Sequence, residues 1–400
     1  MKIGILREGK IPPDRRVPLT PDNCVEVQEA YPDVKVIVQP SAIRCFSDEA
    51  YRAKGIAVED DLHECNVLMG VKEVPEEELL PGKIYFFFSH TIKKQEYNRE
   101  LLRTILRKNI QLVDYEVLTN KDGFRIIGFG RFAGLVGAYN GIRAFGLRSR
   151  IFNLKPAWQC DGMREMLQQL TRINLPALKI TLTGDGRVAA GVVELLEFMK
   201  IQKLSPEQYL KIEKPAFPVY TQLLPQHYVR RKDGNEFGLM HFFNQPQLYE
   251  NAFGPYARST NLLIAAAYWD PKAPLLFSAE DMKREDFKIR VISDITCDIE
   301  GSIPSTLRAA TIEEPFYDYN PDTGKIEPPF SRSLNITVQA VDNLPNELPK
   351  DASAEFGRNL IDQVFPHLFG DDSDGIIQRA SIAKDGKLTE RFAYLNDFVR

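Results

Sequence analysis

The chain has 400 residues, of which 44% are hydrophobic and 26% charged, with 25 Gly and 26 Pro. This is the composition of a globular protein that is long enough for two domains, and it excludes disordered and collagen-like chains. The 51 Lys and Arg against 55 Asp and Glu give a formal net charge of -4. We therefore expect neither nucleic acid nor a membrane surface as a partner.

The sequence also argues against export and membrane insertion. No apolar run reaches the roughly 18 residues of a transmembrane helix. The start, Met1-Lys2-Ile3-Gly4-Ile5-Leu6, lacks the apolar core and cleavage site of a secretory signal. The five cysteines are odd in number and never form a C-x-x-C pair, so we expect reduced thiols, no zinc site and a cytoplasmic location. They stand at positions 24, 45, 65, 160 and 297.

Short apolar runs alternate with helical stretches in the N-terminal part of the chain. This alternation indicates a parallel sheet with crossover helices. The predicted strands are residues 2–6, 34–39, 67–71, 84–88 and 111–114, and the predicted helices are residues 21–30, 48–54 and 94–108.

A glycine-rich segment at residues 128–137 continues into small and apolar residues up to about Leu147, which predicts a closely packed helix near a domain junction. A second alternating block follows, beginning with a strand at residues 179–182, and a helix is predicted at residues 352–368. The polar and aromatic residues 214–259 are too many for an ordinary loop, so we expect an ordered insertion there.

These elements predict an α/β protein with two Rossmann-like domains, each a parallel sheet flanked by helices. Residues 1–140 and 331–400 are expected to form a substrate domain, and residues 141–330 a dinucleotide-binding domain that contains the insertion. The active site is expected in the cleft between them, because open α/β sheets bind ligands beyond the carboxyl ends of their strands.

The clearest motif is Ile-Thr-Leu-Thr-Gly-Asp-Gly-Arg-Val-Ala-Ala-Gly at residues 180–191, a strand that turns into a helix. Such a turn lets backbone N–H groups and the helix N-terminus approach a pyrophosphate. The spacing departs from the strict G-x-G-x-x-G, with Ala189 in the third-glycine position, so an ordinary tight turn is the alternative. The expected dinucleotide-binding residues are Gly184, Asp185, Gly186, Arg187 and Val188.

The next strand, at residues 202–204, does not end in the acidic residue that would bind a ribose 2'-hydroxyl. The motif therefore leaves NAD and NADP equally open as the cofactor.

Lys72 and His90 each follow the carboxyl end of a predicted parallel strand, where ligands bind. Histidine titrates near neutrality and burial can bring a lysine there, so the pair could serve as acid and base in imine chemistry. Glu116 follows a third strand and could tune the pKa of either group by proximity. The alternative is a surface lysine and an ordinary loop histidine.

Three cations, Arg16, Lys93 and Arg125, occur in the same block. Guanidinium groups bind carboxylates bidentately, so this set suits a substrate with several carboxylates, although surface ion pairs are the alternative. Asp294 and Asp298 lie at another strand end. No His or Cys pattern accompanies them, so we expect no metal and a role in orienting the substrate amine or the nicotinamide ribose.

Together these motifs resemble those of lysine-ketoglutarate reductase, the saccharopine-forming part of the aminoadipic semialdehyde synthases, and of the lysine-forming saccharopine dehydrogenases. They are more distantly similar to alanine dehydrogenase and the soluble part of transhydrogenase. The most specific stretches are Phe-Phe-Ser-His-Thr-Ile-Lys at 87–93 and Asp-Asn-Leu-Pro at 342–345. The full set of matching stretches is residues 15–21, 68–75, 86–95, 112–116, 129–141, 183–191, 268–274, 293–302 and 341–349.

The resemblance implies an acid–base role for Lys72 and His90, modulated by Glu116. It implies further that substrate carboxylates bind to Arg16, Lys93 and Arg125, and it places Asp298 beside the nicotinamide and the substrate.

The implied reaction interconverts saccharopine with L-lysine and 2-oxoglutarate through an imine, by hydride transfer with NAD or NADP. Arg131 stands where relatives have an aromatic or polar residue, and we expect an extra substrate-binding cation there. Since the sequence ends at Arg400, we expect only one step of the pathway.

The expected partners are therefore the small molecules lysine, 2-oxoglutarate and saccharopine, and the expected state is a monomer or a small homo-oligomer. Two alternatives stay open. One is a related amino-acid dehydrogenase that acts on alanine or forms an opine, and the other is an NAD(P)-binding regulatory protein without catalysis.

Overall fold

The computed structural model describes residues 1–400, which fall into two compact units. Met1–Phe129 and Pro349–Arg400 form the first unit, and Gly130–Leu348 forms the second. The expected boundaries lay at residues 140 and 331 instead. They differ because helix α4 (Gly130–Ser149) packs along its length in the second unit, and strand β16 (Ile336–Gln339) belongs to the sheet of that unit.

The first unit contains an eight-stranded sheet in the order β18-β17-β6-β5-β4-β1-β2-β3. Neighbouring strands from β6 to β3 are parallel, and β17 and β18 are antiparallel at one edge. The strands are β1 (Lys2–Ile5), β2 (Lys35–Val38), β3 (Ala57–Val58), β4 (Val67–Met69), β5 (Ile84–Phe87), β6 (Gln111–Asp114), β17 (Ser381–Lys384) and β18 (Lys387–Leu388).

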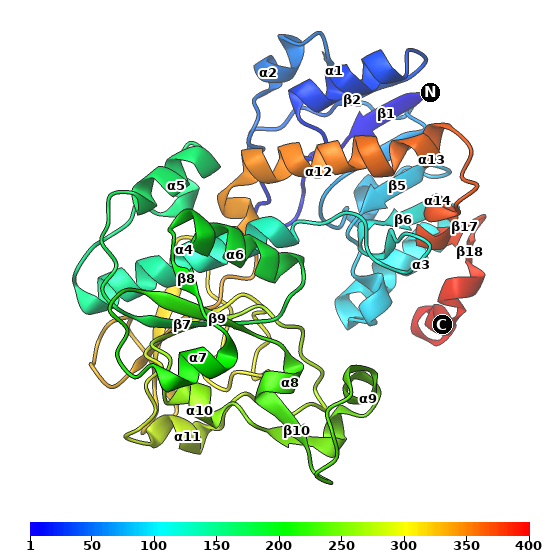
Figure 1. Cartoon of the computed structure of the whole chain (residues 1–400). Helices are drawn as coiled ribbons and strands as arrows, with labels where there is room; N and C mark the ends of the chain where they lie inside the picture. Colours follow the sequence, from blue (N-terminus) through cyan, green and yellow to red (C-terminus); the bar gives the residue numbers. More distant parts are fainter. The chain divides into compact units, whose positions relative to one another are not determined.

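Helices cover both faces of this sheet, which is why its central strands are apolar on both sides. On one face, Tyr85 and Phe87 of β5 share a core cluster with Leu102 of α3. On the other face, Phe356 of α12 packs edge-on against Tyr115, with ring centroids 5.0 Å apart. Figure 1 shows α12 running across the strands. The helices are α1 (Pro21–Ala30), α2 (Asp48–Arg52), α3 (Arg99–Arg107), α12 (Pro349–Gln363), α13 (Phe365–Phe369), α14 (Ile376–Ala380) and α15 (Asn396–Val399).

Two predicted helices are shorter than expected. The one predicted at residues 94–108 begins only at Arg99, because His90 and Lys94 both adopt a left-handed backbone with φ of 51°. That conformation divides the preceding segment into two short 3-10 turns. The helix predicted at residues 352–368 is broken between α12 and α13, where Pro366 cannot donate the backbone hydrogen bond that would continue it.

The second unit contains another eight-stranded sheet, in the order β15-β14-β16-β13-β12-β7-β9-β8. The six strands from β16 to β8 are parallel, and β14 and β15 are antiparallel at the edge. Both units thus have the α/β architecture expected from the sequence. The further strands are β7 (Lys179–Thr183), β8 (Gln202–Lys203), β9 (Val219–Leu223), β12 (Leu262–Ala265), β13 (Val291–Asp294), β14 (Phe316–Asn320) and β15 (Lys325–Glu327).

Helices α4 and α6 lie on one side of this second sheet, and α7, α10 and α11 on the other (Figure 1). The serine hydroxyl of Ser293 in β13 donates to the carbonyl of Gly137 in α4, which ties that helix to the sheet. The remaining helices are α5 (Met163–Leu170), α6 (Arg187–Phe198), α7 (Pro206–Lys211), α10 (Gly254–Ala257) and α11 (Ala279–Lys283).

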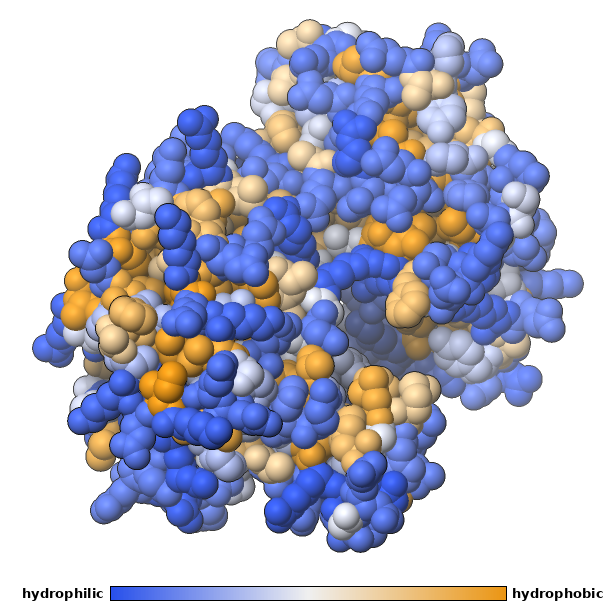
Figure 2. All heavy atoms as spheres, in the orientation of Figure 1, coloured by the Kyte–Doolittle hydropathy of each residue, from blue (hydrophilic) through white to orange (hydrophobic).

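The insertion expected at residues 214–259 begins later than predicted. β9 lies inside this range, yet it is an integral strand between β7 and β8. The inserted elements follow it: α8 (Pro225–Tyr228), the β10–β11 hairpin (Val229–Arg231 and Tyr249–Asn251) and α9 (Leu239–Asn244). Apolar side chains gather on the surface over α9 (Figure 2), where Met240 and Phe243 are exposed. None of the helices has the length and apolar character needed to cross a bilayer.

Helices α4 and α6 cross at two glycines without any room for side chains. A Cβ atom on Gly134 of α4 would lie 1.9 Å from the carbonyl oxygen of Val188. A Cβ on Gly191 of α6 would lie 2.0 Å from the carbonyl oxygen of Arg131. Both obstacles are backbone atoms, so a side chain at either position would push the two helices apart. Gly134, in the segment where small residues were expected to allow close packing, therefore serves a helix crossing within the second unit.

We predict that Gly134→Ala destabilises the protein by about 3 kcal/mol, because overpacking at a rigid helix crossing cannot be relieved by a side-chain rotation. Thermal denaturation of the purified chain measures the effect. The control is Gly186→Ala, since a Cβ at Gly186 meets no heavy atom within 4 Å. Equal losses of stability in the two variants would show that the crossing tolerates a methyl group.

Candidate active site

Lys72 lies just beyond the carboxyl end of β4, on a loop that a neighbouring carboxylate holds in place. Glu8, which follows the adjacent strand β1, accepts hydrogen bonds from the backbone N–H groups of Val71 (2.6 Å) and Lys72 (2.8 Å). Burial, followed by the charge of Asp14, raises the pKa of Glu8 to about 8. No local sequence pattern predicts this contact, because Glu8 and Lys72 meet only through the pairing of β1 with β4.

His90 follows β5, the next strand of the sheet, and its imidazole meets the carboxylate of Glu73. Nδ1 of His90 lies 2.6 Å from Oε1 of Glu73, and Nζ of Lys10 donates to Oε2 of the same carboxylate at 2.7 Å. Burial would raise the pKa of Glu73, but the hydrogen bonds from His90 and Lys10 outweigh it and lower the pKa to about 2. Glu73 is thus an ionised acceptor that fixes the imidazole.

The Lys72 ammonium lies in the electrostatic field of the same groups. Burial lowers the pKa of Lys72, and the positive charge of Arg16 adds to this effect, while Asp14 and Glu73 oppose it. Arg16 is itself buried and donates from Nε to Asp14 at 2.9 Å, with its guanidinium 4.1 Å from the ring centroid of Phe129. The first unit therefore brings together Lys72, His90 and Arg16, and adds three carboxylates that sequence reasoning missed: Glu8, Asp14 and Glu73.

Glu116 follows β6, where the buried Asp114 accepts its backbone N–H at 2.7 Å. The carboxylate of Glu116 lies 3.3 Å from Nζ of Lys93. The carboxylate in contact with His90 is therefore Glu73, whereas Glu116 pairs with a cation expected to bind substrate. The second oxygen of Glu116, Oε2, is buried and has no hydrogen-bond partner. A buried acceptor of this kind is satisfied when a donor group of a ligand approaches it.

Arg125 and Arg131 occupy different environments. The guanidinium of Arg125 lies 5.3 Å from the ring centroid of Phe88, the residue that follows β5, and beside Gly128. Arg131 belongs to α4 of the second unit, where its Nε and Nη2 both donate to Glu194 of α6 at 2.6 Å. This bidentate ion pair links the two crossing helices, so the geometry favours a structural role for Arg131 over the expected substrate contact.

The glycine turn of the second unit joins β7 to α6. Gly184 has φ of 96°, and a Cβ there would come within 3.0 Å of the backbone of Ala267, so only glycine fits. Gly186 is the N-cap residue of α6, and residues 185–187 are exposed. The open N-terminus of a 12-residue helix behind a glycine turn provides backbone donors for an anion. These residues therefore fit the pyrophosphate of a dinucleotide.

A cavity of about 330 Å³ adjoins the carboxyl ends of β7 and β12. Its walls are largely aromatic and apolar, and the indole Nε1 of Trp269 is buried there without an acceptor. An aromatic cavity with one unused donor beside the turn suits the base of a nucleotide. Asp298 follows β13 at the same edge of the sheet and is exposed. The cavity is lined by Thr183, Tyr228, Val229, Phe242, Phe243, Pro246, Ala267, Tyr268, Trp269, Asp270, Ala273, Pro274, Leu276 and Ser302.

The strand that lies beside β7 is β9, and not β8, the strand that follows β7 in the sequence. A ribose-binding residue is therefore expected at the end of β9. Gln222 occupies this position and donates from Nε2 to the carbonyl of Gly184 at 2.9 Å. Its amide oxygen accepts from Nζ of Lys203 at 2.8 Å. The amide of Gln222, with the ammonium group of Lys203 beside it, thus stands where a carboxylate was sought.

The structure brings together no group of three or more His, Cys, Asp or Glu side chains that could hold a metal ion. Asp294 accepts hydrogen bonds from the hydroxyls of Thr296 (2.7 Å) and Thr306 (2.6 Å) and stabilises the loop after β13.

Residues 4–136 match the family model of the alanine dehydrogenase/PNT N-terminal domain. The chain is 30% identical to the alpha-aminoadipic semialdehyde synthase of Arabidopsis thaliana, over 98% of this chain and 41% of that protein. It is 30% identical to the mitochondrial alpha-aminoadipic semialdehyde synthase of Mus musculus, over 96% and 46%. The chain belongs to the family of these proteins. It spans less than half the length of either relative.

A further family member is the saccharopine dehydrogenase (NAD(+), L-lysine-forming) of Yarrowia lipolytica, which is 22% identical over 90% of each chain. Among solved structures, an L-alanine dehydrogenase superposes with a TM-score of 0.63 over 100% of this chain and 99% of its own, at 15% identity. The transhydrogenase from Sinorhizobium meliloti gives 0.62, over 97% and 100%, at 14% identity. The resemblance to the saccharopine-related family is confirmed, as is the two-domain α/β fold.

We predict that Glu73→Gln lowers the free energy of unfolding by roughly 2 kcal/mol at pH 6, because the ion pairs to His90 and Lys10 are lost. The folded pKa of Glu73 is below its usual value of 4.5, so its contribution is complete above pH 4.5 and is lost as the pH falls toward about 2. The gap between wild type and variant should therefore shrink in acid. Glu77→Gln, at an exposed position, is the control. A gap that stays constant with pH would contradict the ionised pairing.

Proposed function

We propose that this protein catalyses the NAD(P)-dependent interconversion of saccharopine with L-lysine and 2-oxoglutarate. The observation that carries the proposal is the contact between the Glu73 carboxylate and His90, with the Lys72 ammonium in the same charged cluster. The similarity to alpha-aminoadipic semialdehyde synthases and saccharopine dehydrogenases supports the substrate class.

In the condensing direction, the amine of lysine must lose a proton before it attacks the keto carbon, and the resulting carbinolamine must lose water. We assign the base to Lys72, because burial and Arg16 lower its pKa and favour its neutral form. We assign the acid that protonates the leaving hydroxyl to His90, whose Nδ1 is held by Glu73 so that the other ring nitrogen is free to exchange a proton. A bound nicotinamide supplies or accepts the hydride.

The cations of the first unit are assigned to the substrate carboxylates. Arg16, Lys93 and Arg125 each lie near a neighbouring carboxylate or aromatic ring that limits their side-chain freedom. Saccharopine carries three carboxylates, so several fixed cations suit it better than they suit a monocarboxylate. Glu116, whose Oε2 has no partner, is assigned to an ammonium group of the substrate. Arg131 is not included, because it belongs to the second unit, where its ion pair with Glu194 joins α4 to α6.

The dinucleotide is assigned to the glycine turn of the second unit, with Gly184, Gly186 and the N-terminus of α6 at the pyrophosphate. Asp185, Arg187 and Val188 complete this set, and Asp298 is assigned to the nicotinamide end from its place after β13. Gln222 in place of a carboxylate leaves both NAD and NADP as candidates. The five cysteines are all free, which supports a reducing compartment such as the cytoplasm.

The test is oxidation of NADH and of NADPH by the purified chain, with lysine plus a panel of keto acids and, separately, with ammonia plus pyruvate. We expect turnover with lysine and 2-oxoglutarate. Lys72→Met should reduce kcat by about 10²-fold or more and leave dinucleotide affinity unchanged, as the loss of an acid–base group requires. Lys54→Met, at a surface ion pair with Asp22, is the control. Turnover only with pyruvate and ammonia, or near-normal turnover of Lys72→Met, would refute the proposal.

We predict that Arg125→Ala raises the KM for 2-oxoglutarate by about 10- to 100-fold, because a charge-assisted hydrogen bond to a carboxylate is lost. Steady-state kinetics with varied keto acid measures the effect, and the KM for lysine should change far less. Arg107→Ala removes an exposed arginine of α3 and serves as the control. An unchanged KM for the keto acid would remove Arg125 from the substrate-binding set.

A further inference from the structure

A cationic cavity of about 430 Å³ lies where the parallel strands of the second sheet begin. Asn261, Arg290 and Ser333, which line it, come just before strands β12, β13 and β16. The glycine turn follows the opposite, carboxyl end of β7, which runs parallel to β12. The cavity and the turn therefore lie at opposite edges of one sheet, so this cavity is not part of the proposed dinucleotide site.

The charge of this cavity is one-sided. Five of its twelve lining residues are cationic, and none is acidic. This is unusual for a chain whose net charge is -4, because its carboxylates outnumber its cations. The lining residues are Phe145, Arg148, Ser149, Arg150, Asn261, Lys288, Arg290, Val291, Phe330, Ser331, Arg332 and Ser333.

Only two of the five cations have a carboxylate of the chain as a counter-ion. Arg148 lies 3.7 Å from the buried Asp318, and Arg332 lies 3.4 Å from Glu327. The other three, Arg150, Lys288 and Arg290, form no ion pair within 4.0 Å. Three like charges at one cavity without a counter-ion repel one another, and this repulsion is relieved when an anion binds.

Among these three cations, Arg290 shows the effect of burial and of a nearby positive charge most directly. Its guanidinium is half-buried, and its Nη1 donates at 3.0 Å to the carbonyl of the preceding residue, Ile289. Burial and the nearby charge of Arg148 both lower the pKa of Arg290. The pKa of Lys179 is lowered as well, first by burial and then by the positive charge of Lys288. The positive potential therefore extends beyond the cavity wall.

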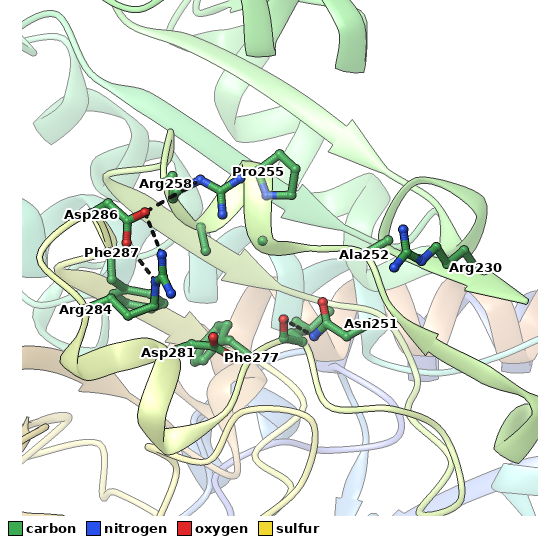
Figure 3. A pocket seen from close by; sticks show the side chains of 13 residues that line it. Arg230, Asn251, Ala252, Pro255, Arg258, Phe277, Asp281, Arg284, Asp286 and Phe287 are labelled. Atoms are coloured by element: carbon green, nitrogen blue, oxygen red, sulfur yellow. Dashed lines mark hydrogen bonds and ion pairs between the residues drawn. The ribbon is translucent and has the colours of Figure 1, made fainter. Parts of the chain in front are cut away.

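Another cavity of the same unit, of about 530 Å³, has arginines but a different charge balance (Figure 3). There Arg284 donates to both oxygens of Asp286 at 2.9 and 3.1 Å, and Arg258 lies 3.9 Å from the same carboxylate. Arg230 lies 2.7 Å from Glu250. Each arginine there already has an anionic partner, so this second cavity offers an anion little gain.

We propose that the cationic cavity binds a small oxyanion with two or more negative charges, either a phosphate or a multicarboxylate. Arg150, Lys288 and Arg290 supply N–H donors that no carboxylate of the chain occupies, and guanidinium groups match the oxygen geometry of both anions. Phe145 and Phe330 provide apolar wall for the carbon skeleton of an organic anion. The site is a candidate for an effector, since it lies at the edge opposite the glycine turn.

The test is isothermal titration of the full chain with citrate and, separately, with inorganic phosphate. The ionic strength is held constant with KCl, and NADH or NADPH, whichever the chain binds, is present at saturation. We expect one equivalent to bind at this cavity, with a dissociation constant that rises at least tenfold in the double variant Lys288→Gln with Arg290→Gln. Citrate bound by the substrate-binding cations of the first unit should be unaffected by this double variant. The matched control is Arg284→Gln in the cavity of Figure 3, for which we expect less than a twofold change. Thermal denaturation checks that the variants are folded.

Preference for citrate assigns the site to multicarboxylates, and preference for phosphate assigns it to phosphates; either result supports the proposal. Equal affinity in wild type and double variant, or no binding above that of chloride, would overturn it. If the chain binds neither NADH nor NADPH, the proposed function fails, but the anion titrations still decide whether this cavity is a site.

Discussion

The arrangement of the candidate catalytic residues in the first unit depends on one side chain, the carboxylate of Glu73. One of its oxygens meets His90, which follows β5, and the other accepts from Lys10, which lies in the segment after β1. Glu73 itself follows β4, so one side chain joins the ends of three neighbouring strands. Glu8 adds a second link, because it binds the backbone beside Lys72. With both links in place, a lysine and an imidazole are held by groups that are themselves buried or paired.

The strands that were predicted from the sequence lie within one or two residues of those in the structure, because a strand that is buried on both faces is apolar throughout. β9 was instead assigned to the insertion. Residues 21–30 and 111–114 form the elements that were expected there. Two features depend on information that local patterns do not contain. The left-handed backbone at Lys94 divides a helical pattern, and the order of β8 and β9 in the sheet is set by packing and not by chain order.

Candidate residues could be predicted where a strand end marked them, but their partners could not. Lys72 and His90 were expected to approach each other because neighbouring strands carry them. Glu73 stands next to Lys72 in the sequence, yet its contact with His90 depends on the loop after β4 and the left-handed backbone of His90. From the sequence, Arg131 was expected to bind substrate. Its ion pair with Glu194 becomes visible only where α4 and α6 cross in the structure.

The arginines of this molecule differ in whether a carboxylate of the chain pairs with them. Arg131 donates from two of its nitrogens to Glu194 and so gains little from a further anion, as is true of Arg284 on Asp286. Arg290 donates to the carbonyl of the neighbouring Ile289, and the charge of Arg148 lowers its pKa. A sequence records all three as the same residue type. Because no carboxylate of the second unit pairs with Arg290, an anion from solution could pair with its guanidinium without displacing an internal counter-ion.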